Sequence, residues 1–131
     1  MVERKPKNSQ EQKFRASIFE EHRPWGKFRS FPHDKAGSLK IITVKPGAAL
    51  SLQYHHRRSE FWVVLDAGLE VTVGEKTWRP KENEEIFIPS QAPHRLRCVG
   101  NRPGRIMELW LGKSDESDIV RLQDDYGRKT D

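Results

Sequence analysis

The chain of 131 residues is long enough for one domain with a buried core and too short for two domains of ordinary size. Hydrophobic residues make up 34% and charged residues 33%, but apolar clusters recur along the middle of the chain, which excludes disorder throughout. The 24 Lys and Arg residues outnumber the 19 Asp and Glu residues, and the net charge of +5 favours an anionic partner such as nucleic acid, a membrane surface or a phosphorylated metabolite.

Three features of the sequence bear on compartment and partners. No apolar run approaches the roughly 20 residues that cross a bilayer, and residues 1–13 lack the apolar segment of a signal peptide. Cys98 is the only cysteine, which excludes a disulfide within the chain. Much of the basic excess lies near the N-terminus without helical periodicity. We therefore expect a cytoplasmic protein with neither a membrane nor a nucleic-acid partner.

The two ends of the chain are expected to differ from its middle. Residues 1–13 are polar and lack a periodic apolar face, so they are predicted to form a flexible tail, with one domain at residues 14–131. Residues 9–21 and 114–123 are alternatively predicted to form short helical turns, with Ser114 or Ser117 as a cap of the second.

From residue 41 onward, short runs rich in β-branched and aromatic residues alternate with turns that contain Gly and Pro. The turns recur at roughly the spacing typical of a sandwich or barrel, and no helical connection of a parallel α/β fold is visible. The sequence therefore predicts an all-β fold. Its predicted strands are residues 41–44, 50–54, 61–65, 69–73, 85–88, 95–99 and 106–111.

Residues 51–62 contain side chains suited to metal binding. Alternate side chains of a strand share a face, so Gln53 and His55 point one way while Tyr54 and His56 point the other. If residues 57–59 form a tight hairpin, the next strand returns Glu60 beside His55. An amide oxygen, an imidazole and a carboxylate would then converge.

His94 is a fourth candidate ligand, from a distant part of the sequence. It follows a turn bracketed by Pro89 and Pro93, which can aim its imidazole inward. Mixed nitrogen and oxygen donors suit Zn²⁺, Mn²⁺, Fe²⁺, Co²⁺ or Ni²⁺, and four protein ligands leave positions for water or substrate. A run of His and Arg residues is also typical of a solvated turn, so spacing alone leaves both interpretations open.

Motifs along most of the chain match one known family. They are Arg23-Pro24-Trp25-Gly26, residues 40–47, residues 51–62, Val71-Thr72-Val73-Gly74, Glu82-Asn83-Glu84, Ile88-Pro89, His94-Arg95-Leu96, Asp118-Ile119-Val120-Arg121 and Asp124-Asp125-Tyr126-Gly127-Arg128. By these motifs the chain resembles the type II phosphomannose isomerase cupins, which also form the C-terminal part of bifunctional mannose-1-phosphate guanylyltransferase/mannose-6-phosphate isomerases.

The resemblance implies a double-stranded antiparallel β-barrel (cupin or jelly roll) that holds one divalent metal ion. The implied ligands are Gln53, His55, Glu60 and His94. The chain departs from the family pattern at three other positions: Arg57 stands where many members have His, Ala67 replaces a turn Gly, and Gln91 replaces the Gly before the second-motif His.

The implied activity is metal-dependent isomerisation of mannose 6-phosphate to fructose 6-phosphate, or of a close sugar phosphate, in GDP-mannose and polysaccharide biosynthesis. Basic side chains would bind the phosphate and Trp62 would stack on the sugar. The phosphate candidates are Lys40, Arg58 and Arg95. Glu108, which shares a strand face with Ile106 and Trp110, and His56, which neighbours the ligand segment, are the candidate catalytic bases.

Two other functions stay open at this point. One is a non-catalytic cupin that binds a sugar phosphate or sugar nucleotide beside a separate guanylyltransferase chain, which Arg57 and the small size of the chain favour. The other is a metal-dependent dioxygenase, but the long family match favours a sugar-phosphate function over this one. Small cupins often pair through sheet edges, so we expect a homodimer.

Overall fold

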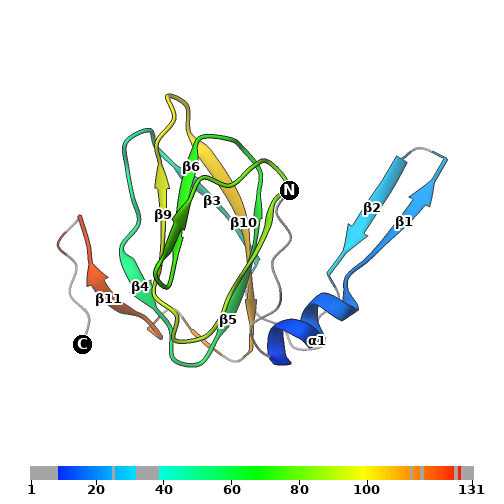
Figure 1. Ribbon diagram of the computed structural model, residues 1–131, viewed down its shortest axis with the longest axis horizontal. Coiled ribbons are helices and arrows are strands. Elements are labelled where there is room, and N and C mark those ends of the chain that lie inside the picture. The colour runs from blue at the N-terminus through cyan, green and yellow to red at the C-terminus, as the bar shows by residue number, and fades with distance from the viewer. Residues whose placement is uncertain are drawn as a thin grey trace. The chain divides into compact units, whose positions relative to one another are not determined.

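The computed structural model describes residues 9–24, 26–31, 39–112, 114–115, 117–125 and 127. The chain divides into two compact units, one holding Val2–Ala36 and the other Gly37–Asp131. The first unit contains helix α1 (Ser9–Ser17) and a hairpin of strands β1 (Phe19–Arg23) and β2 (Gly26–Ser30), as Figure 1 shows.

Helix α1 agrees with the alternative prediction of helical turns for residues 9–21, although strand β1 begins within that range. An ion pair between Arg15 Nε and Glu11 Oε2, 2.7 Å apart and one turn apart in sequence, stabilises the helix. Residues 9–13, predicted to belong to a flexible tail, are thus helical. Residues 1–8 of that tail lie outside the described residues.

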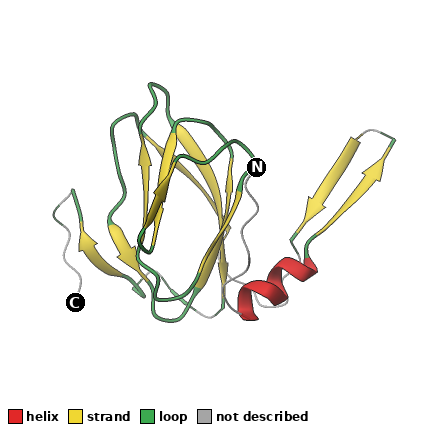
Figure 2. Cartoon of the chain, viewed as in Figure 1, coloured by secondary structure: helices red, strands yellow, loops and turns green. Residues whose placement is uncertain are grey.

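The second unit consists of two antiparallel sheets that pack as a jelly roll (Figure 2), which confirms the predicted all-β double-stranded architecture. One sheet has the strand order β3-β10-β5-β8 and the other β11-β4-β9-β6-β7. The strands are β3 (Leu39–Val44), β4 (Leu52–Tyr54), β5 (Ser59–Val64), β6 (Leu69–Val73), β7 (Lys76–Trp78), β8 (Glu85–Ile88), β9 (His94–Cys98), β10 (Gly104–Leu111) and β11 (Val120–Gln123).

The hydrophobic core lies between the two sheets and fixes the inward face of each strand. It includes the buried side chains of Val64, Leu69, Val71, Ile86 and Cys98. Since side chains two positions apart on a strand share a face, a core residue determines where its polar neighbour points. The inward polar residues each lie two positions from a core residue: Glu60 from Trp62, His94 from Leu96, and Glu108 from Ile106.

Strand β11 corrects the prediction of helical turns over residues 114–123. Val120–Gln123 is extended and pairs antiparallel with β4, with Val120 opposite Tyr54 and Arg121 opposite Gln53. Pairing satisfies backbone groups along the edge of β4, and this tertiary gain outweighs a weak local helical propensity.

Strands β1, β2 and β7 were also not predicted. Strand β7 is only three residues long and follows a tight turn at Gly74, whose φ of 62° favours glycine.

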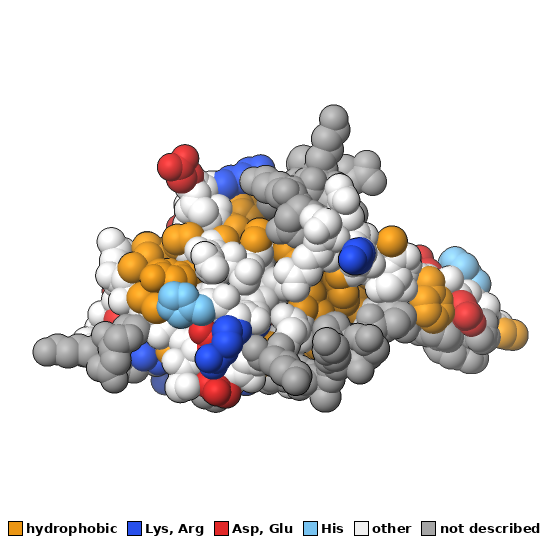
Figure 3. Space-filling model, turned by 90° about the horizontal axis from the view of Figure 1, so that it is seen from below, with side chains coloured by type: hydrophobic (Ala, Val, Ile, Leu, Met, Phe, Trp, Pro, Cys, Tyr) orange, Lys and Arg blue, Asp and Glu red, His pale blue; other side chains and the backbone are white. Residues whose placement is uncertain are grey.

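The surface mixes charges of both signs. On the face shown in Figure 3, described basic and acidic side chains lie beside each other, next to groups of hydrophobic side chains. The net positive charge is therefore not gathered into one basic patch among the described side chains of that face. None of the described helices has the length and hydrophobicity needed to cross a membrane.

Candidate metal centre and cavity

Three buried side chains converge between the two sheets of the jelly roll. His55 comes from the turn after β4, Glu60 from β5 and His94 from β9, and their ligand atoms all lie within 4.8 Å of one another. The Nε2 atom of His55 is 3.1 Å from Oε2 of Glu60, and Nε2 of His94 is 3.7 Å from Oε1 of the same carboxylate. Three of the four predicted ligands therefore face a common point.

Backbone carbonyls hold both imidazoles in one orientation. Nδ1 of His55 donates to the carbonyl of Asp118 at 2.6 Å, and Nδ1 of His94 donates to the carbonyl of Ala92 at 2.9 Å. With Nδ1 engaged in this way, each ring directs its Nε2 toward Glu60, and Nε2 of His94 is buried without a hydrogen-bond partner among the described residues. A fixed Nδ1–H with a free Nε2 is the arrangement found in metal-ligating histidines.

Gln53 lies directly across the sheet from His94, as its cross-strand partner between β4 and β9. Its Oε1 accepts a hydrogen bond from Ser51 Oγ at 2.6 Å, while its Nε2 lies 3.4 Å from Nε2 of His55. A half-turn of the amide exchanges these two atoms, and the Ser51 hydroxyl can serve either one as a partner. The amide oxygen therefore reaches the cluster by rotation about one side-chain bond.

Arg58 provides the positive charge beside this cluster. Its buried guanidinium donates from Nε to Glu60 Oε2 at 3.0 Å, and its Nη2 lies 3.2 Å from Nε2 of His55. Its Nη1 also donates to Ser114 Oγ and to the carbonyl of Asp115, both at 3.1 Å. Arg58, predicted as a phosphate ligand, thus serves as a counter-charge for Glu60.

Two Glu-x-Trp motifs face each other on neighbouring strands. Nε1 of Trp62 donates to Glu60 Oε1 at 3.0 Å on β5, and Nε1 of Trp110 donates to Glu108 Oε1 at 2.8 Å on β10. In the antiparallel register Glu60 pairs with Trp110, and Glu108 pairs with Trp62. Each carboxylate is therefore held by the indole of its own strand, and the two carboxylates lie diagonally across the strand pair.

The environment drives the pKa values of these two carboxyls apart. Burial raises the pKa of Glu60, but the hydrogen bond from His55 and the charges of the adjacent His and Arg side chains outweigh it and hold that pKa well below its ordinary range. Burial, and next the charge of Glu60, raise the pKa of Glu108 to about 8, against a weaker opposing effect of the Trp110 hydrogen bond. Burial also lowers the pKa of His94. An ionised carboxylate thus lies beside a neutral one, a combination typical of acid–base sites.

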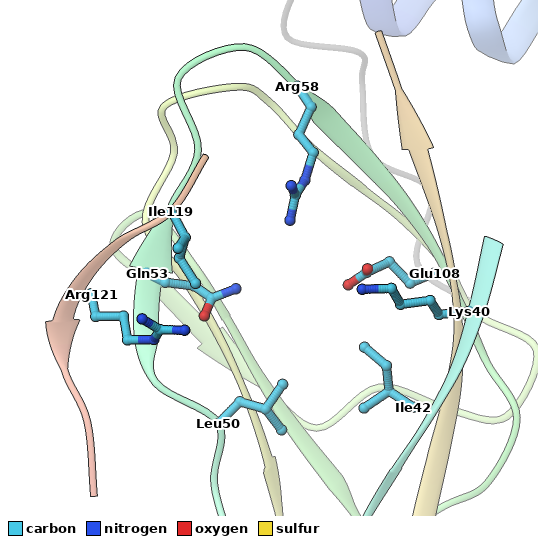
Figure 4. A pocket seen from close by; sticks show the side chains of 8 residues that line it. All are labelled: Lys40, Ile42, Leu50, Gln53, Arg58, Glu108, Ile119 and Arg121. Carbon is cyan, nitrogen blue, oxygen red and sulfur yellow. The ribbon is translucent and has the colours of Figure 1, made fainter. Parts of the chain in front are cut away.

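A cavity of about 190 Å³ adjoins the cluster. Figure 4 shows Glu108 and Lys40 on one wall, Gln53 and Arg121 on the opposite wall, and Arg58 between them. Three apolar side chains complete its lining: Ile42, Leu50 and Ile119. The strand carrying Arg121 was predicted to be helical, and so this cavity residue was missed.

The structure does not bring every predicted residue to the cavity. His56 is exposed, on the opposite face from His55, with its ring against the edge of Tyr54 at 5.3 Å between centroids. Arg95 donates from Nε to the carbonyl of Leu50 at 3.0 Å and so ties β9 to the segment before β4. Trp62 is buried and holds Glu60 through its indole, but it is not among the described residues that line the cavity.

Asp118, which sequence reasoning did not single out for the site, organises the turn after β4. Its carboxylate accepts from the backbone N–H of His56 at 2.9 Å, the backbone N–H of Arg57 at 3.0 Å and the Ser114 hydroxyl at 2.8 Å. Burial raises the pKa of the Asp118 carboxyl, but these hydrogen bonds outweigh it and hold the pKa at about 2. Since the carbonyl of Asp118 also accepts from Nδ1 of His55, this residue supports the candidate metal ligand His55.

Replacing Asp118 with Asn is expected to destabilise the protein by about 1–3 kcal/mol at neutral pH, because the amide cannot accept from all three donors. The folded-state pKa of Asp118 is depressed, so its stabilising effect is present above pH 3.8 and is lost as the pH falls toward 2. Urea midpoints of wild type and Asp118→Asn should therefore differ at pH 6 and converge toward pH 2.5. A difference that is constant with pH would show that the charge of Asp118 is not the cause.

Comparison with known proteins places this geometry in a family. Residues 7–124 match the family described as Mannose-6-phosphate isomerase C-terminal. The chain belongs to this family. The resemblance inferred from motifs is thereby confirmed, and the family accounts for nearly all of the residues that form the barrel and the cavity.

Members of the mannose-6-phosphate isomerase C-terminal family are found among bacterial polysaccharide biosynthesis proteins. The chain is 44% identical over 108 residues to the xanthan biosynthesis protein XanB of Xanthomonas campestris pv. campestris. It is 44% identical over 110 residues to the alginate biosynthesis protein AlgA of Pseudomonas aeruginosa, and 43% identical over 110 residues to the mannose-1-phosphate guanylyltransferase ManC of Salmonella typhimurium. These alignments cover 82%, 83% and 83% of this chain but only 23% of each relative.

Solved structures of low sequence identity support the cupin fold. The chain resembles CapF of Staphylococcus aureus with a TM-score of 0.61 and 16% identity, over 81% of this chain and 34% of that one. It resembles the sugar epimerase NovW of Streptomyces spheroides with a TM-score of 0.61 and 8% identity, over 80% and 66%. A cupin-2 domain of Rhodospirillum rubrum gives a TM-score of 0.54 at 19% identity, over 61% and 57%.

Proposed function

We propose that the chain is a metal-dependent isomerase that interconverts mannose 6-phosphate and fructose 6-phosphate, or a close pair of sugar phosphates. The observation that carries the proposal is the juxtaposition of a neutral carboxyl, Glu108, with an ionised one, Glu60, beside two imidazoles that present Nε2. Family membership and the cavity lined by basic side chains support the same function.

The residues present fit a divalent metal ion. His55, Glu60 and His94 would hold it, with Gln53 as a fourth ligand after rotation of its amide. This donor set suits Zn²⁺, Mn²⁺, Co²⁺, Ni²⁺ or Fe²⁺. When bound, such an ion supplies Lewis-acid stabilisation of the negative charge that develops on the sugar oxygens.

The remaining cavity residues would bind the substrate and move its proton. Isomerisation needs a proton to leave carbon 2 and a proton to reach carbon 1, and Glu108 is the proposed carrier because a pKa of about 8 lets it take and return a proton near neutral pH. Lys40 and Arg121, on opposite walls, would bind the phosphate together with the sugar hydroxyls nearby. Arg58 would keep Glu60 ionised.

A coupled assay for fructose 6-phosphate formation tests the proposal, with mannose 6-phosphate as substrate and Mn²⁺, Co²⁺ or Zn²⁺ added to metal-stripped protein. We expect turnover that depends on metal and is lost in the Gln53→Ala/His94→Ala double variant. Turnover no greater than that of the double variant with all three metals would reject an isomerase.

Calorimetric titration with mannose 6-phosphate distinguishes an isomerase from a protein that binds the sugar phosphate without converting it. The alignment with a guanylyltransferase over 23% of its length makes a sugar-phosphate-binding module of a larger assembly the second candidate. Saturable binding of mannose 6-phosphate without turnover would select that candidate, whereas efficient turnover would make it unnecessary.

A further inference from the structure

Trp110 contacts cavity residues from both neighbouring strands. It lies on β10, which pairs with β3 on one side and with β5 on the other. The guanidinium carbon of Arg58, which immediately precedes β5, lies 3.4 Å from the centroid of the Trp110 ring. The ammonium nitrogen of Lys40, on β3, lies 4.8 Å from it. Both cations are within the range of a cation–π interaction with one indole.

The same indole also fixes the proposed proton carrier. Nε1 of Trp110 donates to Oε1 of Glu108 at 2.8 Å, and the ring itself is buried, with 5% of its surface exposed. Lys40, Arg58 and Glu108 all line the cavity, but Trp110 is not among the described residues that do. One buried side chain outside the cavity therefore touches three ionisable side chains inside it.

We propose that Trp110 is the positioning residue of this site, acting through its three neighbours rather than on the substrate. Its ring holds the long side chain of Lys40 against the cavity wall, which lowers the entropy lost when Lys40 meets an anion, and it holds Arg58 beside Glu60. Its N–H holds the Glu108 carboxyl in one rotamer toward the substrate. The catalytic part of this proposal rests on the isomerase function proposed above; the part concerning anion binding does not.

Two substitutions of Trp110 distinguish the effect of its aromatic face from the effect of its indole N–H. Trp110→Phe keeps an aromatic face for the two cations and removes the donor to Glu108. Trp110→Leu removes both. The matched control is Trp78→Phe, because Trp78 makes the same type of contacts elsewhere: its Nε1 donates to Glu84 Oε2 at 2.9 Å, and the Lys76 ammonium lies 5.7 Å from its ring.

In the coupled assay with metal-loaded protein, we expect Trp110→Phe to lower kcat about tenfold or more with KM nearly unchanged, since a hydrogen bond to an ionisable carboxyl is lost. Trp110→Leu should lower kcat similarly and also raise KM several-fold, because the cations lose their support. Trp78→Phe should leave both constants at the wild-type values. Equal effects of the two Trp110 variants on KM, or no split between kcat and KM, would overturn the positioning role.

We call the ring of Trp110, with its contacts to Lys40 and Arg58, the cation platform. Calorimetric titration with inorganic phosphate tests this platform without any need for turnover. Trp110→Leu is expected to weaken phosphate binding several-fold, while Trp110→Phe and Trp78→Phe bind as wild type does. If wild type lacks isomerase activity but shows this pattern, the proposed function fails and the platform stands. Phosphate binding of wild-type strength in a folded Trp110→Leu variant, judged by circular dichroism, would disprove the platform.

Discussion

Glu108→Gln is expected to lower kcat about 10²- to 10⁴-fold, the usual contribution of a positioned acid–base group. Glutamine has nearly the same volume as glutamate, and its amide oxygen can still accept from Trp110 Nε1, so the walls of the cavity should stay in place. What is removed is the titratable carboxyl of Glu108, while the other cavity residues are unchanged. Steady-state kinetics with mannose 6-phosphate measures the loss, and competition with a chromophoric chelator measures metal affinity, which should change little.

The matched control for Glu108→Gln is Glu84→Gln. Glu84 is also largely buried and also accepts a hydrogen bond from a tryptophan, Trp78, but it lies outside the described lining of the cavity. Both substitutions replace a carboxyl that accepts from an indole with an amide of nearly the same shape, so a catalytic role predicts a large loss for Glu108→Gln alone. If Glu108→Gln retained more than half of the wild-type kcat, proton transfer would have to be assigned to another group.

The convergence of the metal-ligand candidates could be predicted only in part from local rules. The strand period of two put Gln53 and His55 on one face. The tight hairpin predicted at residues 57–59 is wrong, because β4 and β5 lie in different sheets and do not pair; the connection between them crosses from one sheet to the other, and Glu60 meets His55 across the two sheets. His94 needed a further condition, namely that β9 pairs with β4, and its position after a proline-bracketed turn was the signal. The structure brings His55, Glu60 and His94 together.

Strand parity was less informative for Glu108. On β10 the residues that share its face, Ile106 and Trp110, are apolar, but so are Met107 and Leu109 on the other face. A strand that is apolar on both faces does not reveal which one turns inward. Only the packing of Ile106 in the core shows that Glu108 faces the interior, where burial raises its pKa.

The roles of Arg58 and Arg121 could not be predicted, because they depend on contacts between distant segments. Arg58 lies in a turn, where no periodicity assigns a direction, and its partners Ser114 and Asp115 are more than 50 positions away. Arg95 follows the inward His94 and must therefore point outward, which parity alone would have indicated. Arg121 enters the cavity only because β11 is a strand.

Arg58→Met is expected to destabilise the metal-free protein by about 3–5 kcal/mol, the usual cost of breaking a buried ion pair by removing one partner. Glu60 is 1% exposed and Arg58 is 5% exposed, so the carboxylate would lose its guanidinium partner where water cannot replace it. Urea unfolding in the presence of EDTA measures the effect. The matched control is Arg105→Met, which removes a guanidinium paired with Asp66 at the surface, where the effect should be small.

A second substitution and a metal titration identify the cause of that loss. If uncompensated charge on Glu60 is responsible, then Arg58→Met/Glu60→Gln should be more stable than Arg58→Met alone, because the buried negative charge is removed with its partner. Saturating Mn²⁺ should narrow the gap between wild type and Arg58→Met, since a bound divalent cation supplies the positive charge that Glu60 lacks in the variant. Equal destabilisation with and without metal, together with no recovery in the double variant, would assign the role of Arg58 to packing against Trp110 and to its bonds with the 114–115 segment.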